Sequence, residues 1–314
     1  MRNLGRAMGM VAVALLLSAA AFAQQENRTG QGQAVVTVLA KAHSELAPKI
    51  SQQDLSVKTN GKDSNVTGWL PLRAPDDNLE LVLLIDSSAR NLGAQFKEIE
   101  QFVQSLPAHT KIAIGYMENG RAALAGPLSA DRAQVLRGLH LPSGQSSASP
   151  YFCLSDLAKH WPSGDRAARH EVLLVTNGVD PYNPRYDPDD SYVQSAIADS
   201  VRAGLVVYSI FWDSQNGAGL SSSETANGGQ SLLVLVSQAT GGKCYGMPTS
   251  SPVSLQPYLD DLARRLDNQY ELSFSAHLDR KPAIETLKLK VNGFAAEIDA
   301  PQEVFVDRAG AAAE

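Results

Sequence analysis

The amino-acid sequence predicts an α/β fold: a doubly wound, mostly parallel, Rossmann-like sheet with a small β domain formed by strands from the N- and C-terminal parts of the chain. Strand and helix patterns alternate through the middle of the chain, which is typical of a sheet covered by helices on both faces. Residues 79–85 form a near-continuous apolar run, as expected of a strand buried on two sides. Near both ends only strand patterns occur, and neither set is large enough to bury a core alone.

The first 23 residues have the pattern of a secretory signal peptide. Arg2 and Arg6 precede a short apolar run, and Ala21 and Ala23 are the small residues that signal peptidase requires. The apolar run is shorter than the ~20 residues that a membrane-spanning helix needs. We therefore expect cleavage after Ala23, export to the periplasm or the exterior, and no transmembrane segment in the mature chain.

Charge excludes one class of function. Loss of residues 1–23 removes two positive charges from a formal net charge of −6, so the mature chain stands at −8. A general nucleic-acid binder needs a basic face to neutralise phosphates, so we expect no nucleic-acid partner.

The β domain is predicted from residues 24–78 and 269–308. Turn pairs Asn60-Gly61 and Asn292-Gly293 predict two hairpins, because both residue types tolerate positive φ. Domain termini often lie close together, so we expect the two segments to pair. Residues 309–314 are expected to be a disordered tail. The predicted strands cover residues 34–39, 55–59, 66–70, 270–276, 286–291, 295–298 and 303–306.

Residues 79–268 are predicted to form the α/β domain. Pro107 ends its first helix, Ser149-Pro150 begins a later one, and Gly204 stops another. The predicted strands cover residues 79–85, 111–117, 122–125, 171–176, 205–212 and 243–246. The predicted helices cover residues 92–106, 129–139, 150–161, 191–203, 230–239 and 255–266.

Polar residues follow two of the predicted parallel strands, as DSSAR (residues 86–90) and TNGVD (residues 176–180). The functional crevice of an open parallel sheet lies beyond the carboxyl ends of its strands. If these strands are neighbours, their polar residues face each other there, and the helix that begins at residue 150 can add a hydroxyl. We therefore expect Asp86 and Asn177 to face each other across this crevice, with the Ser149 hydroxyl beside them.

These residues resemble the metal-ion-dependent adhesion site of von Willebrand factor A (VWFA) domains. The chain is similar to VWFA-related proteins exported by Acidobacteria and similar bacteria, closely over residues 79–267 and more loosely in the flanking β segments. In that family an Asp-x-Ser-x-Ser, a Thr before a later helix and an Asp-Gly after the fourth strand hold a cation, usually Mg²⁺. The cation keeps an open position for a carboxylate of a partner. The resemblance implies a VWFA fold and a protein-binding or adhesion function, through a crevice lined by Asp86, Ser88, Arg90, Ser149 and Asn177.

The match to this site is incomplete. Asp86 and Ser88 fit the first two positions, Arg90 replaces the second serine, and Ser149 keeps the hydroxyl of the threonine position. Asn177 replaces the second acid, and magnesium relies on carboxylates. The resemblance therefore implies a degenerate metal site of Asp86, Ser88, Ser149 and Asn177 that binds Mg²⁺ or another divalent cation weakly at best. Arg90 either replaces the cation with a fixed guanidinium charge or points to solvent.

Two further features leave alternatives open. Cys153 and Cys244 can pair in an oxidising compartment or remain two buried thiols. A Pro-rich loop holds four aspartates whose spacing is not that of a calcium-binding loop, so a solvated acidic loop is expected. These aspartates are Asp180, Asp187, Asp189 and Asp190.

The sequence favours a non-enzymatic protein-binding module that acts through the crevice, with a partner protein that the sequence does not identify. The alternative is a structural or assembly component of the cell envelope with an inert site. A hydrolase is the third hypothesis, but no Gly-x-Ser-x-Gly elbow surrounds Ser87 and Ser88, and no histidine is placed beside them. Phosphate-binding glycine loops are also missing after the strand at residues 79–85.

Overall fold

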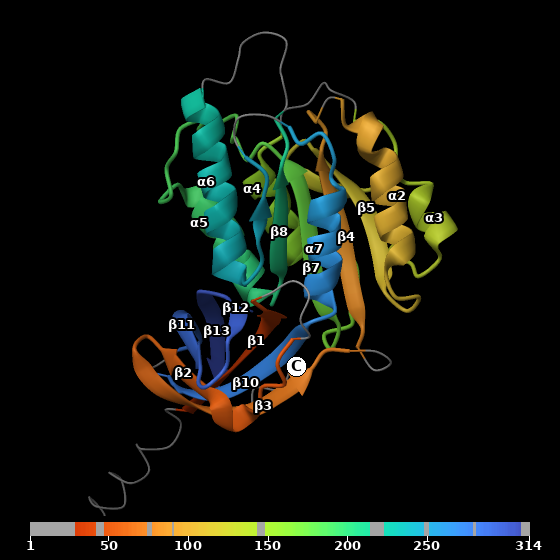
Figure 1. Cartoon of the computed structure of the whole chain (residues 1–314). Coiled ribbons are helices and arrows are strands. Elements are labelled where there is room, and N and C mark those ends of the chain that lie inside the picture. Colours follow the sequence, from red (N-terminus) through yellow and green to blue (C-terminus); the bar gives the residue numbers. More distant parts are fainter. Residues whose placement is uncertain are drawn as a thin grey trace, which may run out of the picture.

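The computed structural model describes residues 29–41, 47–73, 77–89, 91–142, 148–213, 223–247, 251–278 and 281–308. Two sheets organise them, and Figure 1 shows one sheet below the other, with the helices packed around the upper one. The expected signal peptide, Arg90 and the expected tail at residues 309–314 lie outside the described residues. No helix in the described part of the chain combines the length and the apolarity needed to cross a membrane.

The upper sheet has six strands in the order β6-β5-β4-β7-β8-β9. Every neighbouring pair is parallel except β5 and β6. Asn119-Gly120 joins those two strands in a tight turn with both φ angles positive, which forces them to be antiparallel. The strands are β4 (Leu79–Asp86), β5 (Lys111–Glu118), β6 (Arg121–Leu124), β7 (Arg169–Thr176), β8 (Val206–Phe211) and β9 (Cys244–Tyr245).

Helices cover both faces of this sheet. One face packs against α2 and α7, and the other against α4, α5 and α6. Side chains of β4 alternate between the two cores, Leu81 and Leu83 on the first face, Val82 and Leu84 on the second. The helical elements are η2 (Leu92–Gln95), α2 (Phe96–Ser105), α3 (Arg132–Leu136), α4 (Pro150–Lys159), α5 (Ser191–Arg202), α6 (Ser223–Thr240) and α7 (Gln256–Leu266).

The terminal strands form a second sheet of seven strands in the order β10-β3-β2-β11-β13-β1-β12. Antiparallel pairing of β1 with β10 closes six of them into a barrel and leaves β12 outside, beside β1. Closure removes the unpaired edges that an open sheet would expose. The elements are β1 (Thr29–Ala40), η1 (Gln52–Asp54), β2 (Leu55–Thr59), β3 (Lys62–Pro71), β10 (Gln269–His277), β11 (Ala283–Val291), β12 (Ala296–Asp299) and β13 (Glu303–Arg308).

The predicted fold class is wrong for the chain as a whole. The sequence predicts a doubly wound, mostly parallel sheet with a small β domain, whereas the structure has a closed antiparallel barrel and a mixed sheet. The barrel closes because β1 begins at Thr29, before the predicted start at residue 34. This extension supplies the pairing of β1 with β13, at residues 30–32, and lengthens its pairing with β10, which runs from Thr29 to Thr37. Gly30 and Gly32 face inward in this extension, so it lacks the apolar alternation by which a strand is recognised. A β-carbon on Gly32 would lie 2.5 Å from the Phe274 ring, so the wall requires glycine there.

Many individual elements lie close to their predicted positions, and the N-terminal strands do pair with the C-terminal ones. Ser149 caps α4 as predicted, whereas α3 is capped by Asp131 and not by Ser129. Cys153 is buried and Cys244 half-buried, and both are free in the structure. Whether they pair in an oxidising compartment stays a prediction.

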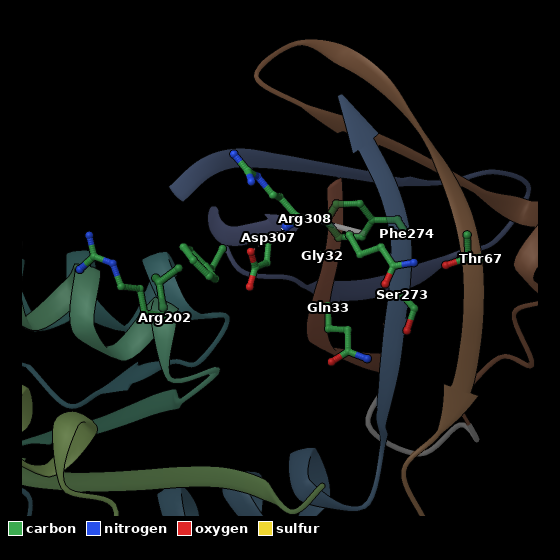
Figure 2. A pocket seen from close by; sticks show the side chains of 11 residues that line it. Gly32, Gln33, Thr67, Arg202, Ser273, Phe274, Asp307 and Arg308 are labelled. Atoms are coloured by element: carbon green, nitrogen blue, oxygen red, sulfur yellow. Dashed lines mark hydrogen bonds between the residues drawn. The ribbon is translucent and has the colours of Figure 1, made fainter. Parts of the chain in front are cut away.

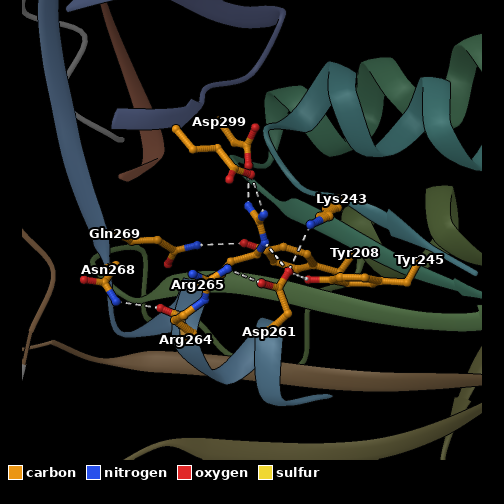
Figure 3. Close-up of polar contacts among 10 residues, drawn as sticks. Tyr208, Lys243, Tyr245, Asp261, Arg264, Arg265, Asn268, Gln269 and Asp299 are labelled. Atoms are coloured by element: carbon orange, nitrogen blue, oxygen red, sulfur yellow. Dashed lines mark hydrogen bonds and ion pairs between the residues drawn. The ribbon is translucent and has the colours of Figure 1, made fainter. Parts of the chain in front are cut away.

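Arg265 of α7 connects the barrel to the mixed sheet (Figure 3). Its side chain is 1% exposed and donates hydrogen bonds to Asp261 at 2.8 Å, to Glu297 of β12 at 3.0 Å and to Asp299. Gln269 at the start of β10 donates to the Tyr208 hydroxyl at 3.0 Å. These contacts attach the barrel below the sheet and leave the carboxyl ends of the parallel strands at the other end.

Candidate functional site

Buried polar side chains gather where β4 and β7 end. The two strands are parallel neighbours, with Ile85 opposite Val175. Residues that follow these positions therefore meet at one edge of the sheet. The helix α4 begins at the same edge, since Tyr151 in its first turn donates a 2.7 Å hydrogen bond from its hydroxyl to the carbonyl of Gly178.

Asp86 is the centre of the first group. Its side chain receives three hydrogen bonds, from the Ser88 backbone N–H at 2.8 Å, the Ser88 hydroxyl at 2.7 Å and the Thr176 hydroxyl at 2.7 Å. Asp86 is 3% exposed. Burial raises the pKa of Asp86, and the hydrogen bonds oppose the rise because they stabilise the charged carboxylate.

Ser149 and Asp180 form the second group. The Ser149 hydroxyl donates to the Asp180 carboxylate at 2.7 Å, and both residues are buried. The other Asp180 oxygen accepts the Tyr182 backbone N–H at 2.8 Å. Ser149 also accepts the backbone N–H of Phe152 at 3.4 Å as the cap of α4.

Thr176 connects the two groups, because its hydroxyl donates to Asp86 and accepts the backbone N–H of Gly178 at 3.2 Å, two residues before Asp180. Burial and then the charges of Asp86, Asp156 and Asp180 raise the pKa of Cys153 to about 12. We term Asp86, Ser88, Ser149, Thr176 and Asp180 the edge cluster.

Asn177 has a local role in this geometry. It is half-buried, and its side-chain oxygen accepts the Val179 backbone N–H at 3.0 Å, which shapes the turn after β7. The buried carboxylate that meets Ser149 belongs to Asp180, three residues further along. Sequence reasoning assigned Asp180 to a solvated loop and did not single out Thr176. Thr176 could have been recognised from the sequence, because it places a hydroxyl at the last position of a buried strand.

The donor set of the edge cluster fits a hard divalent cation. It has two carboxylates and three hydroxyl oxygens, and oxygen ligands are what Mg²⁺ and Mn²⁺ prefer. Each hydroxyl donates its proton to a carboxylate, which leaves oxygen lone pairs for a cation. The neighbouring Ser87 hydroxyl is buried and has no hydrogen-bond partner. Within the described ranges, no group of three or more His, Cys, Asp or Glu side chains could hold a metal, so hydroxyls would be essential ligands.

Three of the four loop aspartates, Asp180, Asp187 and Asp190, accept backbone N–H groups at turns or at a helix cap. Asp190 caps α5 by accepting the backbone N–H of Tyr192 at 2.8 Å. Asp187 accepts the backbone N–H of Asp189 at 3.1 Å. Asp180 is buried against Ser149, so it does not belong to a solvated acidic loop.

A separate pocket of about 570 Å³ lies between the outer wall of the barrel and the C-terminal end of α5 (Figure 2). Gln33, Arg202, Ser273 and Asp307 give it a polar lining. Its residues come from four strands and one helix, so no sequence pattern pointed to it. The pocket lies beside the barrel, at the end of the mixed sheet opposite the edge cluster.

Comparisons with known proteins give distant similarities in structure. No family model and no curated protein matches the chain. The similar solved structures include an aerotolerance-related membrane protein from Bacteroides fragilis NCTC 9343, at 9% identity and TM-score 0.44, over 60% of this chain and 99% of that one. The pilus adhesin SpaC from Lactobacillus rhamnosus GG, in its open conformation, has 10% identity and TM-score 0.46, over 87% of this chain and 49% of that one.

The SpRpn10 VWA domain is a third similar structure, at 10% identity and TM-score 0.40, over 59% of this chain and 95% of that one. Structures similar to this chain thus include a VWA domain. Similarities this distant identify neither a ligand nor a partner.

Proposed function

We propose that this chain is an exported, non-enzymatic protein-binding module that acts through the carboxyl-end edge of its mixed sheet. The observation that carries the proposal is the pair of buried carboxylates, Asp86 and Asp180, each hydrogen-bonded to a hydroxyl at one edge of the sheet. Burying two acids is unfavourable unless they are paired or bind a cation, so the arrangement favours a binding role over a packing role. Asn177 and Arg90 follow the same two strands and complete the proposed binding surface. Export rests on the pattern of residues 1–23.

A divalent cation, Mg²⁺ or Mn²⁺, is the proposed cofactor of this site. Asp86, Ser88, Thr176, Ser149 and Asp180 would hold it. A bound cation would offer an open coordination position to a carboxylate of the partner protein. The residues themselves orient the site, because Ser88 and Ser149 fix the two carboxylates through 2.7 Å hydrogen bonds.

Two observations favour binding over hydrolysis. The Ser88 hydroxyl donates its proton to a carboxylate at 2.7 Å, so that the proton is not held by an imidazole base. The Cys153 thiol has a pKa raised to about 12, which removes it as a nucleophile near neutral pH.

The test uses the immobilised protein and an envelope-protein extract of the source organism, with Mg²⁺ or with chelator. Retained proteins are identified by mass spectrometry for the parent protein, Ser88→Ala, and Thr67→Ala as a matched control on the outer wall of the barrel. We expect a partner retained with Mg²⁺ by the parent and Thr67→Ala and lost in Ser88→Ala and in chelator. A partner retained equally by all three proteins, with Mg²⁺ and with chelator, would contradict the proposal and favour an envelope component with an inert site. Circular dichroism confirms that each variant is folded.

A further inference from the structure

Three exposed tyrosine side chains lie in the segment that follows Asp180 of the edge cluster. Tyr182 is 73% exposed, Tyr186 is 56% exposed, and Tyr192, in the first turn of α5, is 40% exposed. Aromatic rings are usually buried because each removes a large apolar area from water. Several exposed rings in one neighbourhood are therefore characteristic of a surface that another molecule covers.

The loop that carries these rings, residues 181–190, is fixed in place. Pro181, Pro184 and Pro188 restrict its backbone. The Asn183 side chain donates to Asp190 across the loop at 2.9 Å, and the Gln194 side chain donates to the carbonyl of Pro188 at 2.7 Å. A surface that is ordered before binding loses less conformational entropy when a partner covers it.

The same loop is continuous with the edge cluster. It begins directly after Asp180, whose carboxylate accepts the Tyr182 backbone N–H at 2.8 Å. Phe152, in the first turn of α4 after Ser149, lies with its ring 5.9 Å from the Tyr182 ring and 4.2 Å from the Tyr192 ring, measured between centroids. A partner bound at the cluster would therefore reach the tyrosines.

The charges of this loop favour a basic partner segment. Between residues 181 and 190 there is one basic residue, Arg185, against Asp187, Asp189 and Asp190. Although burial opposes it, hydrogen bonds from Asn183 and from the backbone of α5 lower the pKa of Asp190, so its carboxylate is charged at neutral pH. Tyrosine ring faces attract ammonium and guanidinium groups, and the nearby carboxylates add to that attraction.

We infer that Tyr182, Tyr186 and Tyr192, together with Asp187 and Asp189, form a tyrosine face that receives a lysine- or arginine-bearing segment of the partner protein. The inference rests on the proposed function and specifies its partner: an acidic group of the partner would meet the edge cluster, and a basic side chain would lie on the tyrosine face. The tyrosine face needs no cation, so the two parts can be tested separately.

The test follows the tyrosines by ¹⁹F NMR in the full protein labelled with 3-fluorotyrosine. Single Tyr→Phe variants assign the signals of the tyrosine face, and the buried Tyr208 serves as an internal control. The probes are two synthetic twelve-residue Gly/Ser peptides, one with three arginines and one with three glutamates at the same positions. Both titrations are made in chelator, for the parent protein and for Thr67→Ala.

We expect saturable shifts of Tyr182 and Tyr186 with the arginine peptide, unchanged in Thr67→Ala, and an affinity for the glutamate peptide at least about tenfold weaker at low salt. Asp187→Asn with Asp189→Asn should weaken arginine-peptide binding by about threefold, and Tyr186→Ser by a similar factor. Equal shifts with both peptides, or no saturable shift with either, would overturn the inference. If the parent protein bound no cation in a separate titration but still showed these shifts, the cation of the proposed function would be wrong and the tyrosine face would stand.

Discussion

Ser149 and Asp180 are 31 residues apart in the chain, and the hydroxyl of the first donates a 2.7 Å hydrogen bond to the carboxylate of the second. The bond joins the N-cap of α4 to the loop that follows β7. Asp180 thereby supplies the second carboxylate of the edge cluster, which residue 177, an asparagine, does not provide. The proposed cation site therefore depends on Asp180 and Asp86 together.

Asp180→Asn should abolish stabilisation by Mn²⁺. A ligand that binds only the folded state raises stability by mass action, by about 2.7 kcal/mol at one hundred times its Kd. We expect the melting temperature of the parent protein to rise with Mn²⁺ concentration, and that of Asp180→Asn to stay constant. Asp189→Asn, an exposed acid in the same loop, is the matched control and should behave like the parent. A full Mn²⁺ response in Asp180→Asn would exclude Asp180 as a ligand.

Thr176→Val should destabilise the protein without a cation present. The substitution removes the hydroxyl that donates to Asp86 and leaves a buried carboxylate oxygen with one hydrogen bond fewer. The expected loss in free energy of unfolding is about 1–2 kcal/mol, measured by urea denaturation in chelator. The exposed Thr67→Val should change it by less than about 0.5 kcal/mol. Equal effects in both variants would mean that the Asp86 bond contributes nothing.

Much of the candidate site follows from local sequence patterns. Asp86 and Ser88 were predictable because a buried apolar strand must end where polar residues begin, and Ser149 because Ser-Pro is a strong helix start. Asp180 was not predictable as a site residue, because its burial depends on the path of a Pro-rich loop over the start of α4. Asn177 shows the converse: it was predicted to line the crevice, yet its side-chain oxygen accepts the Val179 backbone N–H.

The barrel could be predicted only in part. The turns at Asn60-Gly61 and Asn292-Gly293 mark two hairpins, and pairing of the terminal segments follows from their small size. Closure does not follow, because it depends on the extension Thr29–Gln33, where inward glycines fit against Phe274 and Val306. Such long-range fits have no periodic signal in the sequence.

Arg265→Met should destabilise the junction between barrel and sheet and change its acid sensitivity. Although burial opposes it, hydrogen bonds from Arg264 and Arg265 hold the pKa of Asp261 well below its usual range. Stability from Asp261 is therefore complete above pH ~4 and is lost as the pH falls further. We expect Arg265→Met to lose roughly 3 kcal/mol at pH 7 and to fall less steeply than the parent between pH 4 and pH 2, measured by denaturant unfolding. Parallel pH curves would contradict this role.

Glu171→Gln should stabilise the protein at alkaline pH. Burial raises the pKa of Glu171 to about 7, although Arg169 at 3.4 Å opposes the rise. The folded state then binds more protons than the unfolded state between about pH 4.5 and pH 7, so stability falls as the pH rises through that window. The variant lacks this loss and should exceed the parent by roughly 2–3 kcal/mol at pH 8 and match it near pH 4.5. If the parent protein were as stable as Glu171→Gln at pH 8, the charge on Glu171 would cost no free energy of folding, which would contradict this prediction.

Both cysteines should be titratable as thiols. Cys153 and Cys244 are unpaired, and burial raises the pKa of each. The native protein should react slowly with a thiol reagent at pH 7, and the protein unfolded without reductant should release two equivalents, one for each cysteine in the chain. Zero equivalents after unfolding would mean that a disulfide forms in the oxidising compartment.

Isothermal titration of the chelator-stripped protein with Mg²⁺ and Mn²⁺, beside Ser88→Ala, tests the central claim most directly. The account predicts saturable binding of one cation per chain, with a Kd between roughly 10⁻⁶ and 10⁻³ M, that Ser88→Ala abolishes. No saturable binding to the parent protein, or equal binding to both proteins, would contradict it and leave the edge cluster as a cation-independent surface.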